Sequence, residues 1–426
     1  MNSPARFLAT FGLLWLGSLP LALAETAPSA QKDSPLTLSD CYKLALKQSE
    51  TIAIQQEKMV EAEVHFSRAF SGILPQASFS STDKRQDGNG GSQFTLRKVP
   101  DRKFVFSQPL FSGFKEFAAM AGTQAERRQR AYEKTRAEHL LLVDVADAFY
   151  LLQEKREDLA TLEMIRAALA ERVDELKERV RIGRSRTGEV ISAEAQRLRV
   201  EADLESARTD ETVVRQLLEF LTGRDRIEAI QDPVPPLPPM ESEAAYLPKA
   251  ASRPDVRATE EAAVVAQKQI SIAKAGYLPT VGLNGNYYVE RAGVSKDISW
   301  DASLVVSVPI FTGGETKAAV KEAVSQARQA ELLSQETRRR AVLDIRDAYE
   351  ILKMDLSRSA ALSKALDAAD ENYRLQVQDY RRSLVNNLDV LQALQSFQDS
   401  RRDFIRAHYE ARRQYWRLHV AIGETL

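Results

Sequence analysis

The stretch "FVFSQPLFSGF" at residues 104–114 has a counterpart in "LVVSVPIFTGG" at residues 304–314. Both stretches alternate apolar with small or polar residues, which is the pattern of a β-strand. Both end in proline, an apolar residue, phenylalanine, a small residue and glycine. Because proline cannot donate to a strand ladder and glycine permits a sharp turn, we interpret these residues as strand terminators: Pro109, Phe111, Gly113, Pro309, Phe311 and Gly313.

Other segments of the chain are also written twice, in the same order. "SGILPQASF" (71–79) matches "AGYLPTVGL" (275–283), and "DVADAFYLL" (144–152) matches "DIRDAYEIL" (344–352). The numbering offset is 204 for the first pair (275 − 71) and 200 for the second (344 − 144), so a hairpin loop between them absorbs the difference. Ordered matches at nearly constant spacing indicate an internal duplication.

The ends of the repeats are marked by changes in composition. Residues 1–24 contain one basic residue, an apolar run and a final Ala-Leu-Ala, which predicts a secretory signal peptide. The first repeat is expected over residues 25–230 and the second over residues 241–426. Five prolines between them, at residues 231–240, predict a stiff extended linker.

Each repeat is expected to contain a helix, two strands, a long helix, a tip turn and a last helix, in that order. The expected segments of the first repeat are a helix at 39–73, strands at 76–86 and 102–111, a long helix at 114–182 and a helix at 187–222. Those of the second repeat are a helix at 241–277, strands at 280–290 and 300–311, a long helix at 314–382 and a helix at 386–422.

The two long helices are the most distinctive part of this prediction. Residues 114–182 contain no proline and a single glycine, and residues 314–382 are also free of proline. At about 1.5 Å per residue, such a helix is about 100 Å long, which exceeds the size of an ordinary globular domain. Apolar residues at intervals of three or four predict a coiled-coil seam at Leu162, Ile165, Leu169, Val173, Leu176 and Val180.

Composition argues against several functions. The chain has 59 basic and 60 acidic residues, so no net charge attracts nucleic acid. The single cysteine, Cys41, cannot form an internal disulfide. The four histidines are scattered without metal-ligand spacing, and no nucleophile motif is present. We therefore expect no enzymatic activity, no cofactor and no metal site.

The strands allow two interpretations. Alternating apolar and small residues fit an ordinary half-buried sheet, and they also fit the wall of a membrane barrel. After residue 24 no run approaches the 18 consecutive apolar residues of a membrane-spanning helix. Four strands are too few for a closed barrel, because single-chain barrels begin at about eight, and open edges in lipid are costly. If these strands enter a membrane, several copies of the chain must share one barrel: two copies supply eight strands and three supply twelve.

An ordered set of short motifs resembles the TolC-like outer-membrane efflux proteins. The set consists of "LTLSDCYKLALKQS" (36–49), the paired "LP" strand starts, the paired "PLFSG" and "PIFTG" stops, and "DVL" (389–391). The resemblance extends from residue 36 to residue 423. It implies an α-helical and membrane β-barrel fold in which four strands per protomer contribute to a trimeric 12-stranded barrel, continuous with a long α-helical coiled-coil tunnel.

The resemblance also implies a location, partners and a function. The family is found in the outer membrane of Gram-negative cells and extends into the periplasm. Its homotrimers serve tripartite efflux or type I secretion systems, together with a periplasmic adaptor (membrane fusion protein) and an inner-membrane transporter. The alternative is a soluble periplasmic coiled-coil adaptor, which would have one helical hairpin rather than two strand pairs at equivalent places. The cargo stays open.

The breaks in the long helices are the candidate site. "RIGRSRTGEV" (181–190) aligns with "RRSLVNNLDV" (381–390), and the simplest interpretation is a pair of helix-hairpin turns. The resemblance implies an adaptor-docking tip formed by Gly183, Arg184, Ser185, Ser383, Leu384 and Val385. It also implies a periplasmic gate formed by Asp389, Glu189 and Tyr380, in which Asp389 lines a constriction and the other two form an acid–tyrosine pair.

Three residues of this segment depart from the family pattern. Ser383 stands where the second repeat usually has glycine, and Gln392 stands where a second acidic residue usually follows Asp389. Val385 replaces an arginine that clamps the tip. The resemblance therefore implies a weaker lock than in the best-known members of the family.

Overall fold

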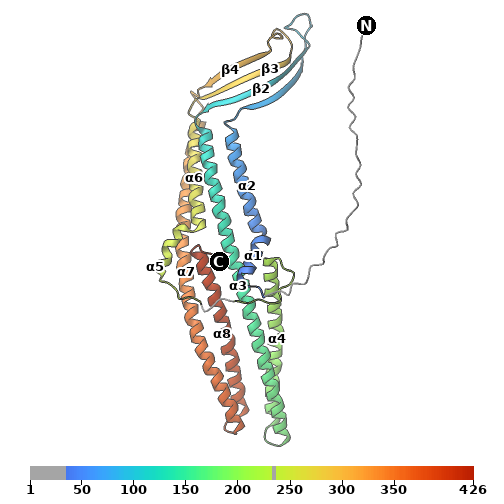
Figure 1. The fold of residues 1–426 in the computed structure, drawn as a ribbon, viewed down its shortest axis with the longest axis vertical. Helices are drawn as coiled ribbons and strands as arrows, with labels where there is room; N and C mark the ends of the chain where they lie inside the picture. The colour runs from blue at the N-terminus through green and yellow to red at the C-terminus, as the bar shows by residue number, and fades with distance from the viewer. Residues whose placement is uncertain (1–34, 233–236) are drawn as a thin grey trace, which may run out of the picture.

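The computed structural model describes residues 35–232 and 237–426. The predicted signal peptide at residues 1–24 and the centre of the proline-rich linker, residues 233–236, lie outside the described residues. The molecule is long and narrow, with helices parallel to its long axis and a small sheet at one end (Figure 1). None of the helices in the described residues is both long and apolar enough to cross a membrane.

The helices and strands follow one order in both repeats. The first repeat contains α1 (Leu38–Gln48), α2 (Glu50–Ser71), β1 (Gln76–Arg85), β2 (Lys98–Ser112), α3 (Lys115–Arg181) and α4 (Thr187–Thr222). The second contains α5 (Glu243–Tyr246), the 3₁₀ helix η1 (Leu247–Ser252), α6 (Pro254–Ala275), β3 (Thr280–Arg291), β4 (Trp300–Ser307), α7 (Glu315–Arg381) and α8 (Asn387–Ala421).

The bounds of matching helices keep the offsets found in the sequence. Both ends of α6 lie 204 residues after those of α2 (254 − 50 and 275 − 71), and both ends of α7 lie 200 residues after those of α3 (315 − 115 and 381 − 181). The two repeats therefore correspond residue by residue, which allows any position in one to be compared with its equivalent in the other.

The first helix of each repeat differs from the prediction of one continuous helix. In the first repeat the chain breaks at Ser49, whose backbone is extended and whose hydroxyl accepts a hydrogen bond from the Ile52 amide at 3.4 Å. Serine favours this capping geometry over a place inside a helix. In the second repeat Pro254 disfavours a helical conformation at Arg253, so α6 begins at the proline.

The predicted strand terminators differ between the repeats: Gly113 directly follows the end of β2, whereas Pro109 and Phe111 lie inside this strand. Strand β4 ends at Ser307, before Pro309, but β2 continues through Pro109 and Phe111 to Ser112. A register shift between Pro109 and Phe111, opposite β3, accommodates the proline within the ladder. The prediction that Pro109 and Phe111 end their strand is therefore wrong.

Glycines turn the chain from the sheet into the long helices. Gly113 has φ +68° and Gly313 has φ +62°, a left-handed conformation that side chains disfavour. At Gly113 a Cβ atom would also lie 2.9 Å from the carbonyl oxygen of Ala275, so a side chain has no room there.

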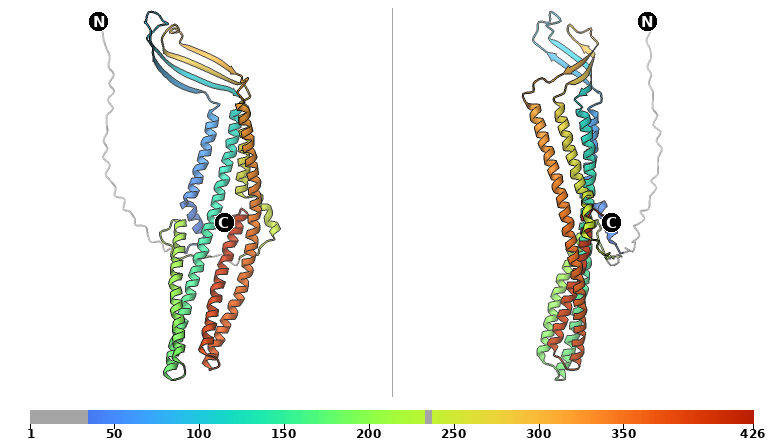
Figure 2. Two further views of the ribbon diagram at one scale, coloured as in Figure 1. Left: turned by 180° about the vertical axis from the view of Figure 1, so that it is seen from behind. Right: turned by 90° about the vertical axis from the view of Figure 1, so that its left-hand side faces the viewer.

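The strands form one antiparallel sheet in the order β1-β2-β3-β4. The two repeats meet where β2 pairs with β3, for example at Phe104 and Tyr287. This leaves β1 and β4 as open edges. Large apolar side chains are exposed along the sheet, among them Phe79, Phe104, Phe106, Leu283, Leu304 and Val306. Among the residues that the structure describes, no layer of helices covers either face of the sheet (Figure 2).

The helices form two layers that share α3 and α7. On the sheet side of the molecule the order is α2, α3, α6, α7, and on the opposite side α4, α3, α8, α7 (Figures 1 and 2). A core at the waist contains Phe149, Tyr150 and Trp416, where the indole of Trp416 donates to the Tyr150 hydroxyl at 3.2 Å. A second core follows the predicted seam of α3 from Leu162 to Leu176.

A buried arginine joins the helices of the second repeat. Arg253 is only 2% exposed, and its guanidinium donates to Asp255 at 2.6 Å and to Asp344 of α7 at 2.9 Å. It also contacts the Ala421 carbonyl of α8 at 3.5 Å. Burial raises the pKa of Asp255, but the hydrogen bonds from Arg253 and the charge of Arg136 outweigh it and hold this pKa below its usual value.

Replacing this arginine is expected to destabilise the fold. Arg253→Ala leaves Asp344 without its cation and leaves Asp255 only the more distant Arg136, at 3.8 Å, which should cost about 3 kcal/mol. The equivalent variant of the first repeat, Ser49→Ala, removes one capping hydrogen bond and should cost about 1 kcal/mol. Thermal unfolding followed by circular dichroism compares the two, and equal losses would contradict the assignment. Because the folded pKa of Asp255 is lowered, the difference should persist above about pH 4 and shrink in stronger acid.

Candidate functional site

The two tip turns lie side by side at the end of the molecule opposite the sheet (Figure 1). Each turn connects a long helix to the last helix of its repeat, over residues 182–186 and 382–386. In the first turn the Arg184 amide donates to the Arg179 carbonyl at 2.8 Å, and in the second the Leu384 amide donates to the Asp379 carbonyl at 2.9 Å. The turns therefore have the same backbone hydrogen-bond pattern, that of a left-handed helix C-terminus.

The residue at the left-handed position differs between the turns. Gly183 has φ +74° and Ser383 has φ +61°. A glycine adopts this conformation without strain, whereas in a serine the close approach of Cβ to the backbone raises the conformational energy. The residues after this position are largely exposed, and Leu384 has 70% of its surface accessible. The tip thus presents apolar surface to solvent.

Asp389 caps the last helix. Its carboxylate accepts from the Asn386 amide at 3.0 Å, and the Asn386 side chain accepts from the Asp389 amide at 3.1 Å. This reciprocal capping box fixes the start of α8 and places a negative charge at the positive end of the helix dipole. The carboxylate is partly exposed, so one chain presents a single charge at this position.

Glu189 and Tyr380 have different polar partners in the described chain. The Glu189 carboxylate accepts from the Ser185 hydroxyl at 2.6 Å, within its own turn. Tyr380 is only 5% exposed, and its ring lies between Arg172, at 3.6 Å from the ring centroid, and Arg179, at 4.3 Å. The aromatic ring therefore holds two cations of α3 against α7.

Arg172 links all the parts of this cluster. Its Nε donates to the Asn387 side chain at 2.9 Å, and its Nη1 donates to Glu175 at 2.7 Å. The Asn387 amide reaches the Glu189 carbonyl at 3.5 Å, which connects the two turns. The buried Nη2 of Arg172 has no hydrogen-bond partner among the described residues. Sequence reasoning did not identify Arg172 or Asn387; the available signal was a charged residue beside the apolar seam.

A groove of about 560 Å³ lies next to this cluster, between α3, α7 and α8. Its wall includes Arg172, Glu175, Val377, Arg381 and Leu394. Within the described residues, no group of three or more His, Cys, Asp or Glu side chains is arranged to hold a metal ion. The groove therefore offers charged and apolar contact surface.

Comparisons with known proteins place this fold. Residues 249–424 match the family model described as "Outer membrane efflux protein". The chain is 24% identical to the outer membrane protein TolC of Vibrio cholerae over 98% of this chain and 95% of that protein. It is 25% identical to the outer membrane efflux protein BepC of Brucella suis over 66% of this chain, and the match spans 60% of BepC.

Solved structures share the whole architecture. The outer membrane protein VceC from Vibrio cholerae superposes with a TM-score of 0.80 at 20% identity, covering 91% of this chain and 96% of that one. CusC gives a TM-score of 0.78 at 17% identity, covering 93% of this chain and 96% of that one. The fold is therefore that of the outer-membrane channels. The second repeat therefore matches the outer membrane efflux protein family, and the whole chain is similar to TolC in sequence and to outer-membrane channels in fold.

Relief of strain at Ser383 gives a test of the tip geometry. Ser383→Gly should stabilise the second turn by about 1 kcal/mol, because glycine adopts positive φ without strain. The converse variant, Gly183→Ser, should destabilise the first turn by a similar amount. Hydrogen exchange of the amides at residues 381–386 and 181–186 reports each turn separately. Slower exchange in Gly183→Ser, or faster exchange in Ser383→Gly, would contradict this account.

Proposed function

We propose that this chain forms the outer-membrane channel of a tripartite efflux or type I secretion system. Three copies close a 12-stranded barrel in the outer membrane, and their helices form a tunnel through the periplasm. The tip docks to a periplasmic adaptor and receives cargo from an inner-membrane transporter. The relatives named AprF and PrtF are protease secretion proteins, and BepC and TolC carry the names of outer-membrane proteins.

One observation supports this proposal most strongly. The sheet has apolar residues exposed along its strands, and both edges, β1 and β4, are unpaired in the single chain. An apolar sheet with open edges is unfavourable in water, and in lipid its unpaired backbone groups cost several kcal/mol each. Pairing β1 of one copy with β4 of the next satisfies both edges. Three copies give the twelve strands that the family resemblance implies.

The proposed tip residues are accessible for docking. Gly183 and Arg184 of the first turn, and Ser383 and Leu384 of the second, are exposed, while Ser185 and Val385 are partly covered. An apolar residue beside charged ones is a favourable contact surface for another protein. Asp389, one per copy, would form a ring of three carboxylates around the threefold axis, and such a ring favours cations.

Assembly and conduction test the proposed channel. The protein, extracted from outer membranes in detergent, should have three times the protomer mass by light scattering, and it should produce discrete conductance steps in planar lipid bilayers. A protein recovered as a monomer from the aqueous fraction, with no conductance, would refute the proposal.

The carboxylate ring makes a separate prediction. Asp389→Asn removes the charge and keeps a side-chain oxygen for the capping box, so the ratio of cation to anion permeability should fall by at least about twofold. Gln392→Glu, one turn further along α8, should raise this ratio. Glu178→Gln, which removes an exposed carboxylate of α3 that pairs with Arg181, serves as the control. Reversal potentials in a salt gradient measure the ratio, and an unchanged value for Asp389→Asn would exclude it from the gate.

A further inference from the structure

The layer of helices next to the sheet has an uncovered helix face at each of its two sides. Helix α6 packs between α3 and α7, whereas its equivalent in the first repeat, α2, packs only against α3 among the helices of the described chain. Helices α2 and α7 are therefore the outer members of the layer (Figure 2). The repeat relates α6 to α2 and α3 to α7, so the helix missing beside α2 corresponds to α7. The chain's own α7 lies on the far side of the layer.

An ion pair joins α3 and α6, and the equivalent residues of α7 and α2 are present but do not pair within the described chain. Arg128 donates both Nε and Nη2 to the Glu261 carboxylate, each at 2.8 Å. The offsets relate Arg128 to Arg328 (128 + 200) and Glu261 to Glu57 (261 − 204), so the same two residue types recur. In the described chain Glu57 is exposed and has no ion pair, and Arg328 pairs only with Glu331 on its own helix.

Positions of α2 and α7 are exposed where their equivalents in α6 and α3 are buried, as expected if a neighbouring helix is missing. Ala258 of α6 is 6% exposed, whereas its equivalent in α2, Ile54, is 55% exposed. On the other side of the contact, Ala125 of α3 is fully buried, and its equivalent in α7, Ser325, is exposed. Val64, on the same stripe of α2 as Ile54 and Glu57, is also half exposed. These faces are complementary in charge and unpartnered in a single chain.

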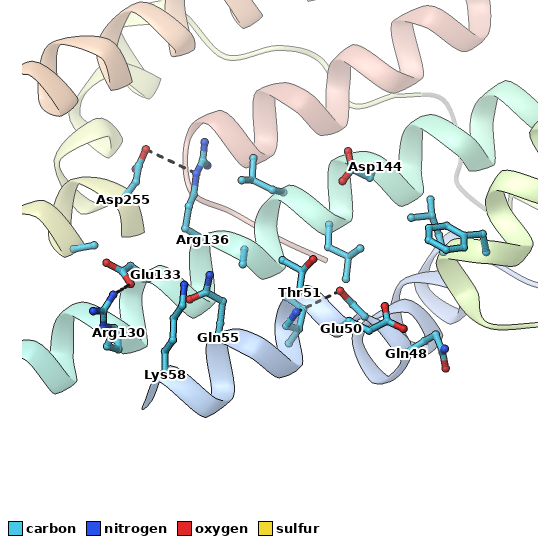
Figure 3. Close-up of a pocket in the computed structure, with 18 of the residues that line it drawn as sticks. Gln48, Glu50, Thr51, Gln55, Lys58, Arg130, Glu133, Arg136, Asp144 and Asp255 are labelled. Carbon is cyan, nitrogen blue, oxygen red and sulfur yellow. Dashed lines mark hydrogen bonds and ion pairs between the residues drawn. The ribbon is translucent and has the colours of Figure 1, made fainter. Parts of the chain in front are cut away.

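A pocket of about 830 Å³ lies at the waist, between α2, α3 and α6 (Figure 3). Ser49 and Asp144 line it. Their equivalents in the second repeat are Arg253 and Asp344, which form the ion pair at 2.9 Å described above. The first repeat therefore keeps the carboxylate and lacks the arginine. No described residue forms an ion pair with Asp144, and burial together with the charge of Asp147 raises its pKa.

The helix expected beside α2 carries the missing cation. Arg338, Arg339 and Arg340 of α7 are exposed and form no ion pair within the described residues. Arg339 is the equivalent of His139 (139 + 200), which is buried on α3. Arg136, one turn before His139 on α3, lies 3.8 Å from Asp255, so this part of α3 faces the start of α6 beside the Arg253 junction. The longer arginine at the equivalent position would reach the pocket at Asp144.

We propose that α7 of a second copy packs along α2 in the register with which α3 packs along α6. Arg328 of the second copy then pairs with Glu57, and Arg339 of the second copy enters the pocket and pairs with Asp144. This inference rests on the proposed homotrimer and specifies how its copies meet. The pocket is thus an arginine site that one chain cannot complete.

Disulfide cross-linking tests the register. A Cβ atom built on Gly122 of α3 lies 3.5 Å from the Lys268 Cβ of α6, a separation at which two cysteines form a disulfide. The equivalent positions are Glu322 of α7 and Val64 of α2. The double variant Val64→Cys/Glu322→Cys should therefore give covalent trimers on oxidation, seen by non-reducing electrophoresis in detergent. The control Val64→Cys/Gln329→Cys moves one cysteine about 10 Å along α7 and should not cross-link.

The possible outcomes separate this inference from the proposed function. Covalent trimers in the test variant alone support the register. A protein that is trimeric by light scattering but cross-links poorly, or no better than the control, overturns the register and leaves the channel proposal intact. A protein that is monomeric before oxidation refutes the homotrimer itself.

Charge exchange tests the two ion pairs. Glu57→Arg and Asp144→Arg should each lower the fraction of trimer in detergent severalfold, because each places like charges together. The paired variants Glu57→Arg/Arg328→Glu and Asp144→Arg/Arg339→Asp should restore it. Unchanged helicity by circular dichroism establishes that the single variants fold. A folded single variant that still trimerises fully, or a paired variant without recovery, would contradict the corresponding contact.

Discussion

The unpaired backbone of two strand edges is the constraint on which this structure depends. A strand offers an N–H and a C=O group at every second residue of its edge, and no strand of the described residues pairs with the outer edges of β1 and β4. The duplicated chain forms both edges at once, one in each repeat. The same duplication leaves α2 and α7 as the outer helices, so sheet and helices end at the same two sides of the molecule.

Elements set by local chemistry were predictable from the sequence. The absence of proline and the seam of apolar residues determine α3 and α7, and the repeated motifs determine the correspondence of the two halves. Where tertiary contacts compete with local preference, the sequence was a poorer guide. Proline at residue 109 reads as a stop, yet β3 holds β2 in the sheet beyond it through an irregular register. Ser49 breaks a helix that periodicity alone would continue.

The candidate site shows the same limit. Gly183 and Asp389 are recognisable because helix ends have strong residue preferences. The cluster around Tyr380 joins residues from α3, α7 and α8. The spacing of residues along the chain does not predict that Arg172 and Asn387 are in contact. In this chain the aromatic ring is held by arginines of its own protomer. Tyr380 therefore has two cations from its own chain, although Val385 of the second turn carries no charge.

The position of one arginine has a consequence for biogenesis. Arg253 closes the junction between α6 and α7 inside a single polypeptide, so this contact forms at any dilution. Ser49 leaves the matching junction open, and in the proposed trimer only a collision between molecules can close it. The α6–α7 contacts then form while the monomer folds. The equivalent contacts between α2 and α7 of another copy form only on association, so their formation depends on protein concentration. In this proposal a newly made chain would remain a folded monomer until the concentration of monomers is high enough for trimers to form.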